Sequence, residues 1–256
     1  MKFIFNKKQP LINLEISWLK VVLLLCVLFI KSTNCIAQNK ENMLEVKKVN
    51  IDTNDLQQLL SNIVADNEIA HANWESHPYK PEVKFGIVYT DNEIVIKYSV
   101  RENAVRAVNS ENNSAVYEDS CCEFFVSPNC DDCYYNFETN CIGTMLLGYK
   151  KLGEKSTRAN ENTMNSVRRF STFGNETFDT QTGDFSWEMI VVIPFTAFFN
   201  HDIKSIEGKT FTANFYKCGD KLPTPHYLSW NPIKTEKPSF HQPAFFGKLK
   251  FLESTF

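Results

Sequence analysis

Alternation of apolar and polar residues is the dominant pattern in the central and C-terminal parts of the chain. The run EIVIKYSV, residues 93–100, follows VKFGIVY after the pair Asp91-Asn92, which favours a tight turn, so the two runs predict a β-hairpin. The alternation predicts that one face of the second strand packs on a core, and that face carries Ile94, Ile96, Tyr98 and Val100. Further strand-like runs are CEFFVS, YYNFETN, TMLLGYK, FSWEMIVVI, FTANFYKC, HYLSW and GKLKFL.

These runs predict an all-β fold. About nine strands follow one another with little helical periodicity between them, and parallel strands would need longer, helical connections. We therefore expect antiparallel sheets that stack as a β-sandwich. One helix is predicted in DTNDLQQLLSNIVADNE, with Asn54 as its cap. The polar segment 151–184 predicts a long loop, part of which, around 167–173, is a candidate strand.

The N-terminal segment has the pattern of an export signal. Lysines precede the apolar run VVLLLCVLFI, which has about half of the ~20 residues that a membrane span needs. Small residues at Cys35 and Ala37 predict cleavage after Ala37. We therefore expect a signal peptide at 1–37, a polar leader with a short helix at 38–66, and a sandwich at 67–256. The exported protein would be periplasmic, at the cell surface or extracellular, with no membrane span after signal removal.

Charge argues against a nucleic-acid partner. The chain has a net charge of −3, and removal of residues 1–37 takes away five lysines and only one acid, Glu15. Nucleic-acid binding depends on Lys and Arg that neutralise phosphates, and no basic stripe is present.

Six cysteines follow the signal, at 121, 122, 130, 133, 141 and 218. An even number in an exported chain is compatible with disulfides. Cys141 and Cys218 fall on different predicted strands and are candidates for a bridge, although spacing does not fix the pairing. Cys130-x-x-Cys133 lacks the second pair of a zinc site and does not open a helix as the redox motif does.

No catalytic motif stands out. The five histidines form no His-Glu-x-x-His arrangement, and nine glycines include no phosphate-binding loop. Glu123, Glu138 and Glu188 lie on predicted strands, so glycoside hydrolysis by a carboxylate pair stays open as an alternative. The aromatic, proline-rich stretch LSWNPIKTEKPSFHQPAFFGKLKF, residues 228–251, fits no regular helix or central strand, and its rings either fill a core or face a ligand.

Four segments in order resemble carbohydrate-binding modules of family 9, and more closely the family-9-like proteins of Bacteroidetes. The segments are VYEDSCCEFFVSP, YYNFETNCIGT, FSWEMIVVIPF and LSWNPIKTEKPSFHQPAFFGKL. The resemblance runs from about Trp74 to the C terminus. It implies a jelly-roll or immunoglobulin-like sandwich that binds a sugar non-catalytically, and so no enzyme activity.

The resemblance also implies a binding site. Tyr117 and Phe240 match two rings that clamp the sugar, and both positions carry tryptophan in the best-known members. Glu123 matches a carboxylate that hydrogen-bonds the sugar. Asn136, Glu138 and Asn140 lie on the strand that supplies further polar contacts, and position 138 is arginine in the well-known members. The apolar faces of a pyranose stack on aromatic rings while its hydroxyls require planar donors and acceptors.

The expected partners are a carbohydrate and separate glycan-degrading enzymes. No cofactor is predicted. Family members often bind calcium, for which Asp119 and Asp131 are available, but no dense Asp and Asn loop assigns its ligands. A haem-binding sandwich is a second hypothesis, and it would use one of the histidines with a methionine as axial ligands. The candidate methionines are Met145, Met164 and Met189.

Overall fold

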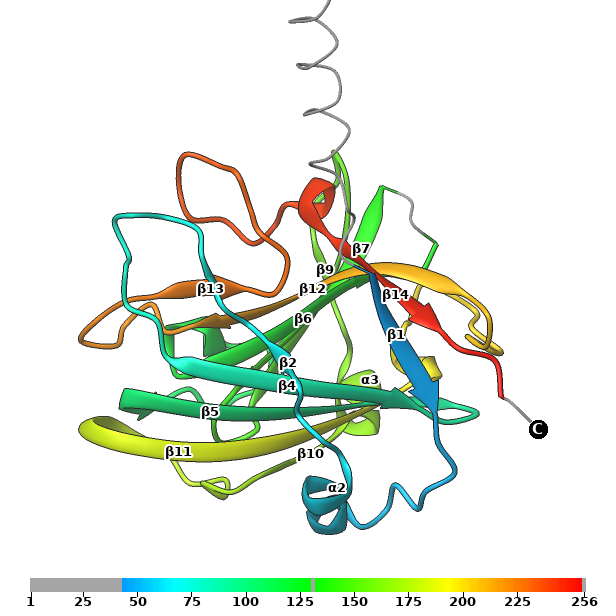
Figure 1. The fold of residues 1–256 in the computed structure, drawn as a ribbon, viewed down its shortest axis with the longest axis horizontal. Helices are drawn as coiled ribbons and strands as arrows, with labels where there is room; N and C mark the ends of the chain where they lie inside the picture. The colour runs from blue at the N-terminus through cyan, green and yellow to red at the C-terminus, as the bar shows by residue number, and fades with distance from the viewer. Residues whose placement is uncertain (1–42, 130–131, 255–256) are drawn as a thin grey trace, which may run out of the picture. The chain divides into compact units, whose positions relative to one another are not determined.

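The computed structural model describes residues 43–129 and 132–254, and these residues form two packed β-layers (Figure 1). The first layer contains β2 (Asn67–Glu68), β4 (Glu82–Tyr89), β5 (Glu93–Ala107), β10 (Arg168–Ser171) and β11 (Phe178–Pro194). The second contains β3 (His71–Ala72), β6 (Cys121–Ser127), β7 (Cys133–Asn140), β8 (Met145–Lys151), β9 (Thr157–Arg158), β12 (Thr210–Cys218), β13 (Tyr227–Ser229) and β14 (Gly247–Phe251). The predicted all-β sandwich is confirmed.

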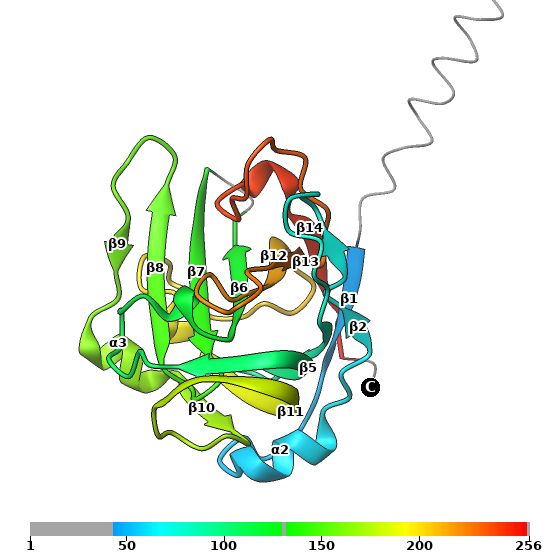
Figure 2. The ribbon, with the colours of Figure 1, turned by 90° about the vertical axis from the view of Figure 1, so that its left-hand side faces the viewer.

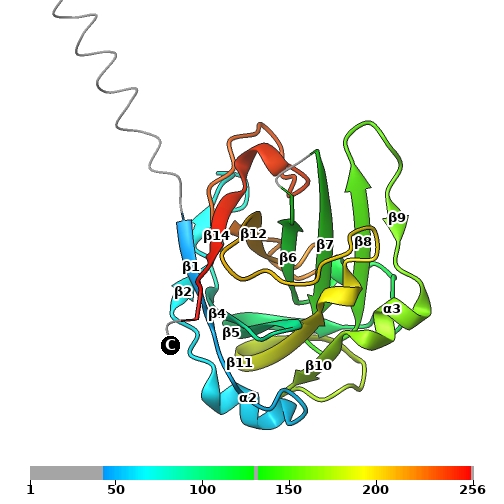
Figure 3. The same cartoon turned by 90° about the vertical axis from the view of Figure 1, so that its right-hand side faces the viewer.

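A single strand, β1 (Met43–Lys48), joins the two layers. Its first residues pair in parallel with β14, and its last two pair in parallel with β4. The layers therefore form one curled sheet with the order β10-β11-β5-β4-β1-β14-β12-β6-β7-β8-β9, and Figure 3 shows β1 between β14 and β4. We predicted a polar leader here, but Val46 is buried and the segment is a strand. The proposed signal peptide lies outside the described residues.

The predicted hairpin is confirmed as β4 and β5, which pair antiparallel from Glu82 opposite Arg101 to Tyr89 opposite Ile94. The core-facing set of β5 is also confirmed, because all four predicted side chains lie in the main core between the layers. That core contains side chains of both layers, and Figure 2 shows the strands of the two layers running in different directions around it.

Two short helices and three 3-10 turns complete the fold of the described residues. They are α2 (Leu56–Asn62), α3 (Glu161–Ser166), η1 (Val116–Glu118), η2 (Phe195–Ala197) and η3 (Pro243–Phe245). The cap of α2 is Asp55, one residue after the predicted Asn54, and its carboxylate accepts from the Gln58 amide at 2.9 Å. Leu59, Leu60 and Ile63 pack with Val95 and thus cover the outer face of the first layer. No helix among the described residues is long and apolar enough to cross a membrane.

A buried ion pair connects the two layers through the core. Lys217 Nζ of β12 lies 2.9 Å from Glu102 Oε2 of β5, with both side chains fully buried, and Trp187 Nε1 donates to the other Glu102 oxygen at 2.8 Å. Burial opposes the charged form of Lys217, but Glu102 raises the lysine pKa overall. His226 Nε2 lies 2.9 Å from Lys217 Nζ, and burial together with this cation lowers the pKa of His226 to about 2. The neutral imidazole therefore accepts from the ammonium group.

Candidate functional site

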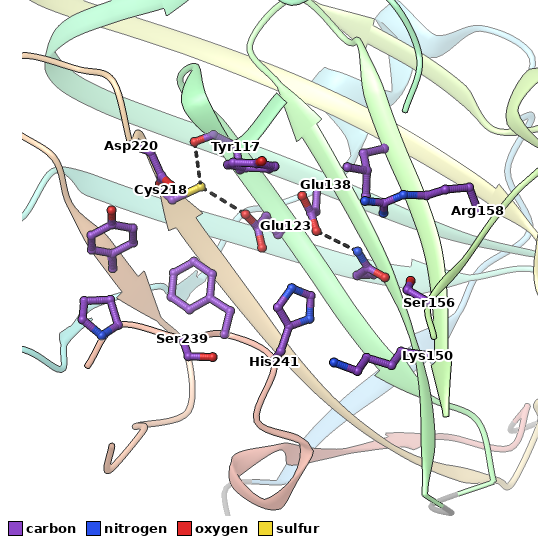
Figure 4. Close-up of a pocket in the computed structure, with 15 residues that line it drawn as sticks. Tyr117, Glu123, Glu138, Lys150, Ser156, Arg158, Cys218, Asp220, Ser239 and His241 are labelled. Atoms are coloured by element: carbon purple, nitrogen blue, oxygen red, sulfur yellow. Dashed lines mark hydrogen bonds between the residues drawn. The ribbon is translucent and has the colours of Figure 1, made fainter. Parts of the chain in front are cut away.

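A cavity of about 400 Å³ opens on the face of the second layer that points away from the main core (Figure 4). The lining side chains come from η1, from six strands (β6, β7, β8, β9, β12 and β13), from the loops after β8 and β12, and from the loop before η3. They are Tyr117, Glu123, Asn136, Glu138, Leu146, Lys150, Ser156, Arg158, Cys218, Asp220, Tyr227, Pro238, Ser239, Phe240 and His241. Five of the six predicted sugar contacts are among them: Tyr117, Glu123, Asn136, Glu138 and Phe240.

Strand register explains why the polar residues meet. Glu123 of β6 lies directly opposite Glu138 of β7, and side chains two residues apart on a strand share a face. Asn136 therefore lies on the same face as Glu138, and its Nδ2 donates to Glu138 Oε1 at 2.7 Å. Cys218 of β12 adds a thiol that donates to Glu123 Oε1 at 3.0 Å. The dashed lines of Figure 4 mark both contacts.

The two glutamates have raised pKa values. Burial, followed by the neighbouring Cys218 and Glu138, raises the pKa of Glu123 well above its usual range. Burial also raises the pKa of Glu138 to about 7, although the Asn136 amide and Arg158 oppose the shift. A carboxyl that keeps its proton to higher pH donates as well as accepts a hydrogen bond. The floor of the cavity is therefore suited to hydroxyl groups, which do both.

The side chain of Tyr117 is 39% exposed at the edge of the cavity. Its backbone is fixed in η1, because the Tyr117 carbonyl accepts from the Asp220 amide at 3.1 Å, and the Cys218 sulfur lies 3.5 Å from the same oxygen. The ring thus projects from a fixed backbone, which is the requirement for a stacking surface.

Phe240 is more deeply set, at 9% exposed. Its ring stacks on Tyr216 with centroids 4.1 Å apart, and Tyr216 Oη donates to the Phe240 carbonyl at 3.1 Å. Trp74 packs 6.2 Å away in the same apolar cluster, and its Nε1 donates to the Thr235 carbonyl at 2.9 Å. The proline-rich stretch therefore serves both of the roles considered for it, since Trp230 lies in the main core and Phe240 borders the cavity.

Asn140 does not line this cavity. Its Oδ1 accepts from the Ile142 and Thr144 amides, and its Nδ2 donates to the Asn109 carbonyl and to Asp119. The side chain is fully buried and holds the turn after β7. Sequence position suggested a sugar contact, but the structure places Asn140 in a network that stabilises the loop.

Asp119 does not fit a calcium site. Its carboxylate accepts from the Val108 and Asn109 amides and from Asn140 Nδ2, and Arg106 Nε lies 3.3 Å from it. These three hydrogen-bond donors and the Arg106 guanidinium occupy the oxygens that a cation would need. Asp131, the other acid considered, lies outside the described residues.

The predicted bridge between Cys141 and Cys218 is wrong. Both thiols are free, and β6 lies between β7 and β12 in the sheet. Cys218 instead donates to Glu123, while the Cys141 thiol donates to the Arg106 carbonyl at 3.6 Å. Cys130 lies outside the described residues.

Glu188 and the candidate haem methionines do not line the cavity. Glu188 of β11 pairs with Lys97 at 2.8 Å in the first layer, away from Glu123 and Glu138. The methionines considered as haem ligands are buried in the main core: Met145, Met164 and Met189.

Several lining residues were missed. Lys150 and Arg158 bring positive charge, and Arg158 lies on β9, inside the segment predicted as a long loop. His241 packs 5.1 Å from Phe125, and burial lowers its pKa to about 4, so the ring is neutral at pH 7. Asp220, whose pKa burial raises to about 6, lies two residues after the end of β12. His241 could have been predicted because it follows Phe240 in the sequence. Nothing in the sequence indicated that β9 pairs with β8.

Comparison with known proteins decides the family. Residues 54–251 match the profile described as carbohydrate-binding family 9. The chain belongs to this family. Family 9 consists of non-catalytic carbohydrate-binding modules, which agrees with the resemblance seen in the sequence.

Solved structures agree with this family 9 assignment. A crystal structure from Bacteroides uniformis, to which carbohydrate binding has been assigned provisionally, is 46% identical over 83% of this chain and 100% of its own, with a TM-score of 0.79. Family 9 modules from Caldicellulosiruptor kristjanssonii, solved with glucose and with cellotriose, are each 12% identical over 84% of this chain. They cover 97% and 95% of their own chains with TM-scores of 0.54, and show a shared fold. Comparison with curated proteins gives no match.

Proposed function

We propose that this family 9 protein binds a carbohydrate non-catalytically in the described cavity, with a sugar ring between Tyr117 and Phe240. The observation that carries the proposal is the convergence of two aromatic side chains and three polar ones, Glu123, Asn136 and Glu138, on one cavity from separate parts of the chain. The volume of about 400 Å³ falls in the range of roughly 300–1,000 Å³ typical of small-molecule sites.

The charged side chains of the cavity favour a sugar that differs from those bound by relatives with arginine at position 138. Where those relatives carry arginine, this chain has Glu138, yet Arg158 supplies a guanidinium to the same cavity from β9. This chain therefore has a carboxyl where those relatives have a guanidinium, and its own guanidinium reaches the cavity from a different strand. Glucose and cellotriose, which the Caldicellulosiruptor modules bind, are the first ligands to test.

Calorimetric titration tests the proposal. We expect dissociation constants between about 1 μM and 1 mM for the preferred glycan, because a small site must offset the entropy of immobilising its ligand. Tyr117→Ala should weaken binding about tenfold or more, whereas Tyr117→Phe, which keeps the stacking ring, should bind as the wild type does. Binding that is unchanged in both Tyr117→Ala and Phe240→Ala would show that the sugar does not lie between the two rings.

Export and a role in polysaccharide capture complete the proposal. The apolar run and the small residues before Gln38 support signal cleavage, and a non-catalytic family 9 module would act beside separate glycan-degrading enzymes. Fractionation of the producing cell, with N-terminal sequencing of the protein, tests this part. A first residue at Gln38 in an exported fraction is the expected result, and an uncleaved cytoplasmic chain would refute it.

A further inference from the structure

Two cysteines and a glutamate meet at the inner wall of the cavity. Cys121 of β6 lies directly opposite Cys218 of β12, and Glu123 follows two residues after Cys121 on the same face of the strand. The two sulfur atoms and a Glu123 carboxylate oxygen lie within 4.8 Å of one another, and all three residues are buried. Strand pairing therefore fixes two thiols and one carboxyl as a compact triangle.

This triangle differs from two of the other buried thiols. Cys122 and Cys141 lie among apolar side chains of the main core, where cysteine acts as a small hydrophobic residue. Cys121 and Cys218 instead adjoin a buried acid, and within the described ranges no ion pair reaches Glu123. A buried glutamate without a cationic partner either keeps its proton or, as a carboxylate, coordinates a metal. The triangle provides the donors for a metal.

We propose that Cys121, Glu123 and Cys218 form a binding site for a thiolate-seeking divalent cation of the zinc type. Tetrahedral zinc with sulfur at ~2.3 Å and carboxylate oxygen at ~2.0–2.2 Å places its ligand atoms about 3.6–3.8 Å apart. The two sulfur atoms and the Glu123 oxygen, which lie within 4.8 Å of one another, reach these distances through small side-chain rotations. On binding, both thiols and the Glu123 carboxyl release their protons to solvent, and two thiolate sulfurs and one carboxylate oxygen form the bonds to the metal.

The cavity gives the ion an entry path and an open coordination position. Glu123 and Cys218 line the cavity, while Cys121 lies behind them. Three protein ligands with a fourth position open to solvent are the arrangement of accessible zinc sites, whereas closed structural sites use four. This inference goes beyond sugar binding, and the site forms whether or not a sugar occupies the cavity.

Cobalt titration of the purified, reduced and chelator-treated protein tests the site without any sugar. We expect one equivalent of Co²⁺ to produce a near-ultraviolet thiolate-to-cobalt absorption band, which Zn²⁺ then abolishes by displacement. Cys121→Ala and Cys218→Ala should each weaken Zn²⁺ binding by about 100-fold or more, since loss of outer hydrogen bonds alone costs about 10–100-fold. The matched control is Cys122→Ala, one residue along β6 on the opposite face, which should bind normally.

Thermal unfolding with and without Zn²⁺ separates metal binding from loss of the fold. Zn²⁺ should raise the Tm of the wild type and of Cys122→Ala, but leave that of folded Cys121→Ala unchanged. The proposal is overturned if the reduced protein shows no thiolate-to-cobalt band, or if both site variants keep it. A disulfide between Cys121 and Cys218 that forms even in the presence of Zn²⁺ would also overturn it.

Discussion

The ring of Phe240 lies flat on the ring of Tyr216, with centroids 4.1 Å apart and planes 4° from parallel. The contact joins a proline-rich loop to the central strand β12, and the Tyr216 hydroxyl donates to the Phe240 carbonyl. Phe240 therefore belongs both to the second apolar cluster and to the wall of the cavity. Tyr117, at 39% exposed, has far less contact with the protein interior.

The two clamp residues should consequently differ in their effect on stability. Phe240→Ala removes a nearly buried ring from an aromatic cluster and should lower the free energy of unfolding by about 3 kcal/mol. Tyr117→Ala should change it by less than about 1 kcal/mol, because the residue is 39% exposed and belongs to none of the apolar clusters. Urea denaturation measures both values. Equal losses in the two variants would contradict the different burial of the two rings.

Tyr216→Phe is the control for the loop anchor. It keeps the stacked ring and removes only the hydroxyl that donates to the Phe240 carbonyl at 3.1 Å. We expect a loss of about 1 kcal/mol, the usual net value of one hydrogen bond. A larger loss than that of Phe240→Ala would assign the anchoring to the hydrogen bond instead of the ring contact.

The buried ion pair between the layers should be sensitive to the loss of one partner. Glu102→Gln leaves the fully buried Lys217 ammonium without its carboxylate, and the free energy of unfolding should fall by about 3–5 kcal/mol. Replacing both partners, as in Glu102→Leu with Lys217→Met, should recover much of this loss, since neither charge then remains buried. Denaturation of Glu102→Leu, of Lys217→Met and of the double variant measures the coupling between the two residues. Losses of free energy of unfolding that simply add in the double variant would show that Glu102 and Lys217 are not coupled.

The fold could be predicted from the sequence because the patterns that indicate it are local. Alternation and the Asp91-Asn92 turn are read within about twenty residues, and the β4–β5 hairpin follows from them. The strand β1 was missed because MLEVKK is short and polar on one face, and its burial depends on β14, two hundred residues later. A strand whose burial depends on partners far away in the sequence shows little hydrophobic pattern of its own.

The site was accessible only in part, for the same reason. Motif resemblance located five cavity residues, but it also selected Asn140, whose side chain serves a loop. The wrong bridge between Cys141 and Cys218 came from counting strands without knowing their order. The actual neighbour of Cys218 is Cys121, and only the register of β6 with β12 reveals it.

Glu138 should make stability depend on pH between about 4.5 and 7. Burial raises its pKa from an ordinary value of 4.5 to about 7, so the folded protein holds this proton more tightly than the unfolded chain. Raising the pH through this window therefore favours unfolding. The contribution of Glu138 to the free energy of unfolding falls by roughly 3 kcal/mol and levels off above pH 7. Below about pH 4.5 the contribution is fully present.

Glu138→Gln, which cannot ionise, tests this pH dependence. Relative to the wild type, its free energy of unfolding should rise by roughly 3 kcal/mol from pH 4.5 to 7. Urea denaturation in the presence of a chelator gives the profile, with Glu176→Gln, an exposed carboxyl in a loop, as the matched control. A difference between Glu138→Gln and the wild type that is constant across this window would contradict a raised Glu138 pKa.

Gly148 should be required for the polar floor of the cavity. It lies opposite Asn136 of β7 and Arg158 of β9, and a Cβ atom at this position would lie 2.5 Å from Asn136 Oδ1 and 3.0 Å from an Arg158 nitrogen. Gly148→Ala must therefore displace the Asn136 amide, which bonds to Glu138. We expect sugar binding to weaken about tenfold, or about 1.4 kcal/mol, by calorimetry.

A double variant distinguishes this mechanism from a general disturbance of β8. If Gly148→Ala acts through Asn136, then Asn136→Ala with Gly148→Ala should bind the sugar no more weakly than Asn136→Ala alone, because the displaced amide is already gone. Gly183→Ala is the matched control, since Gly183 is exposed on β11 and does not line the cavity. Additive losses in the double variant would assign the effect to the strand itself, and binding unchanged in Gly148→Ala would remove Asn136 from the site.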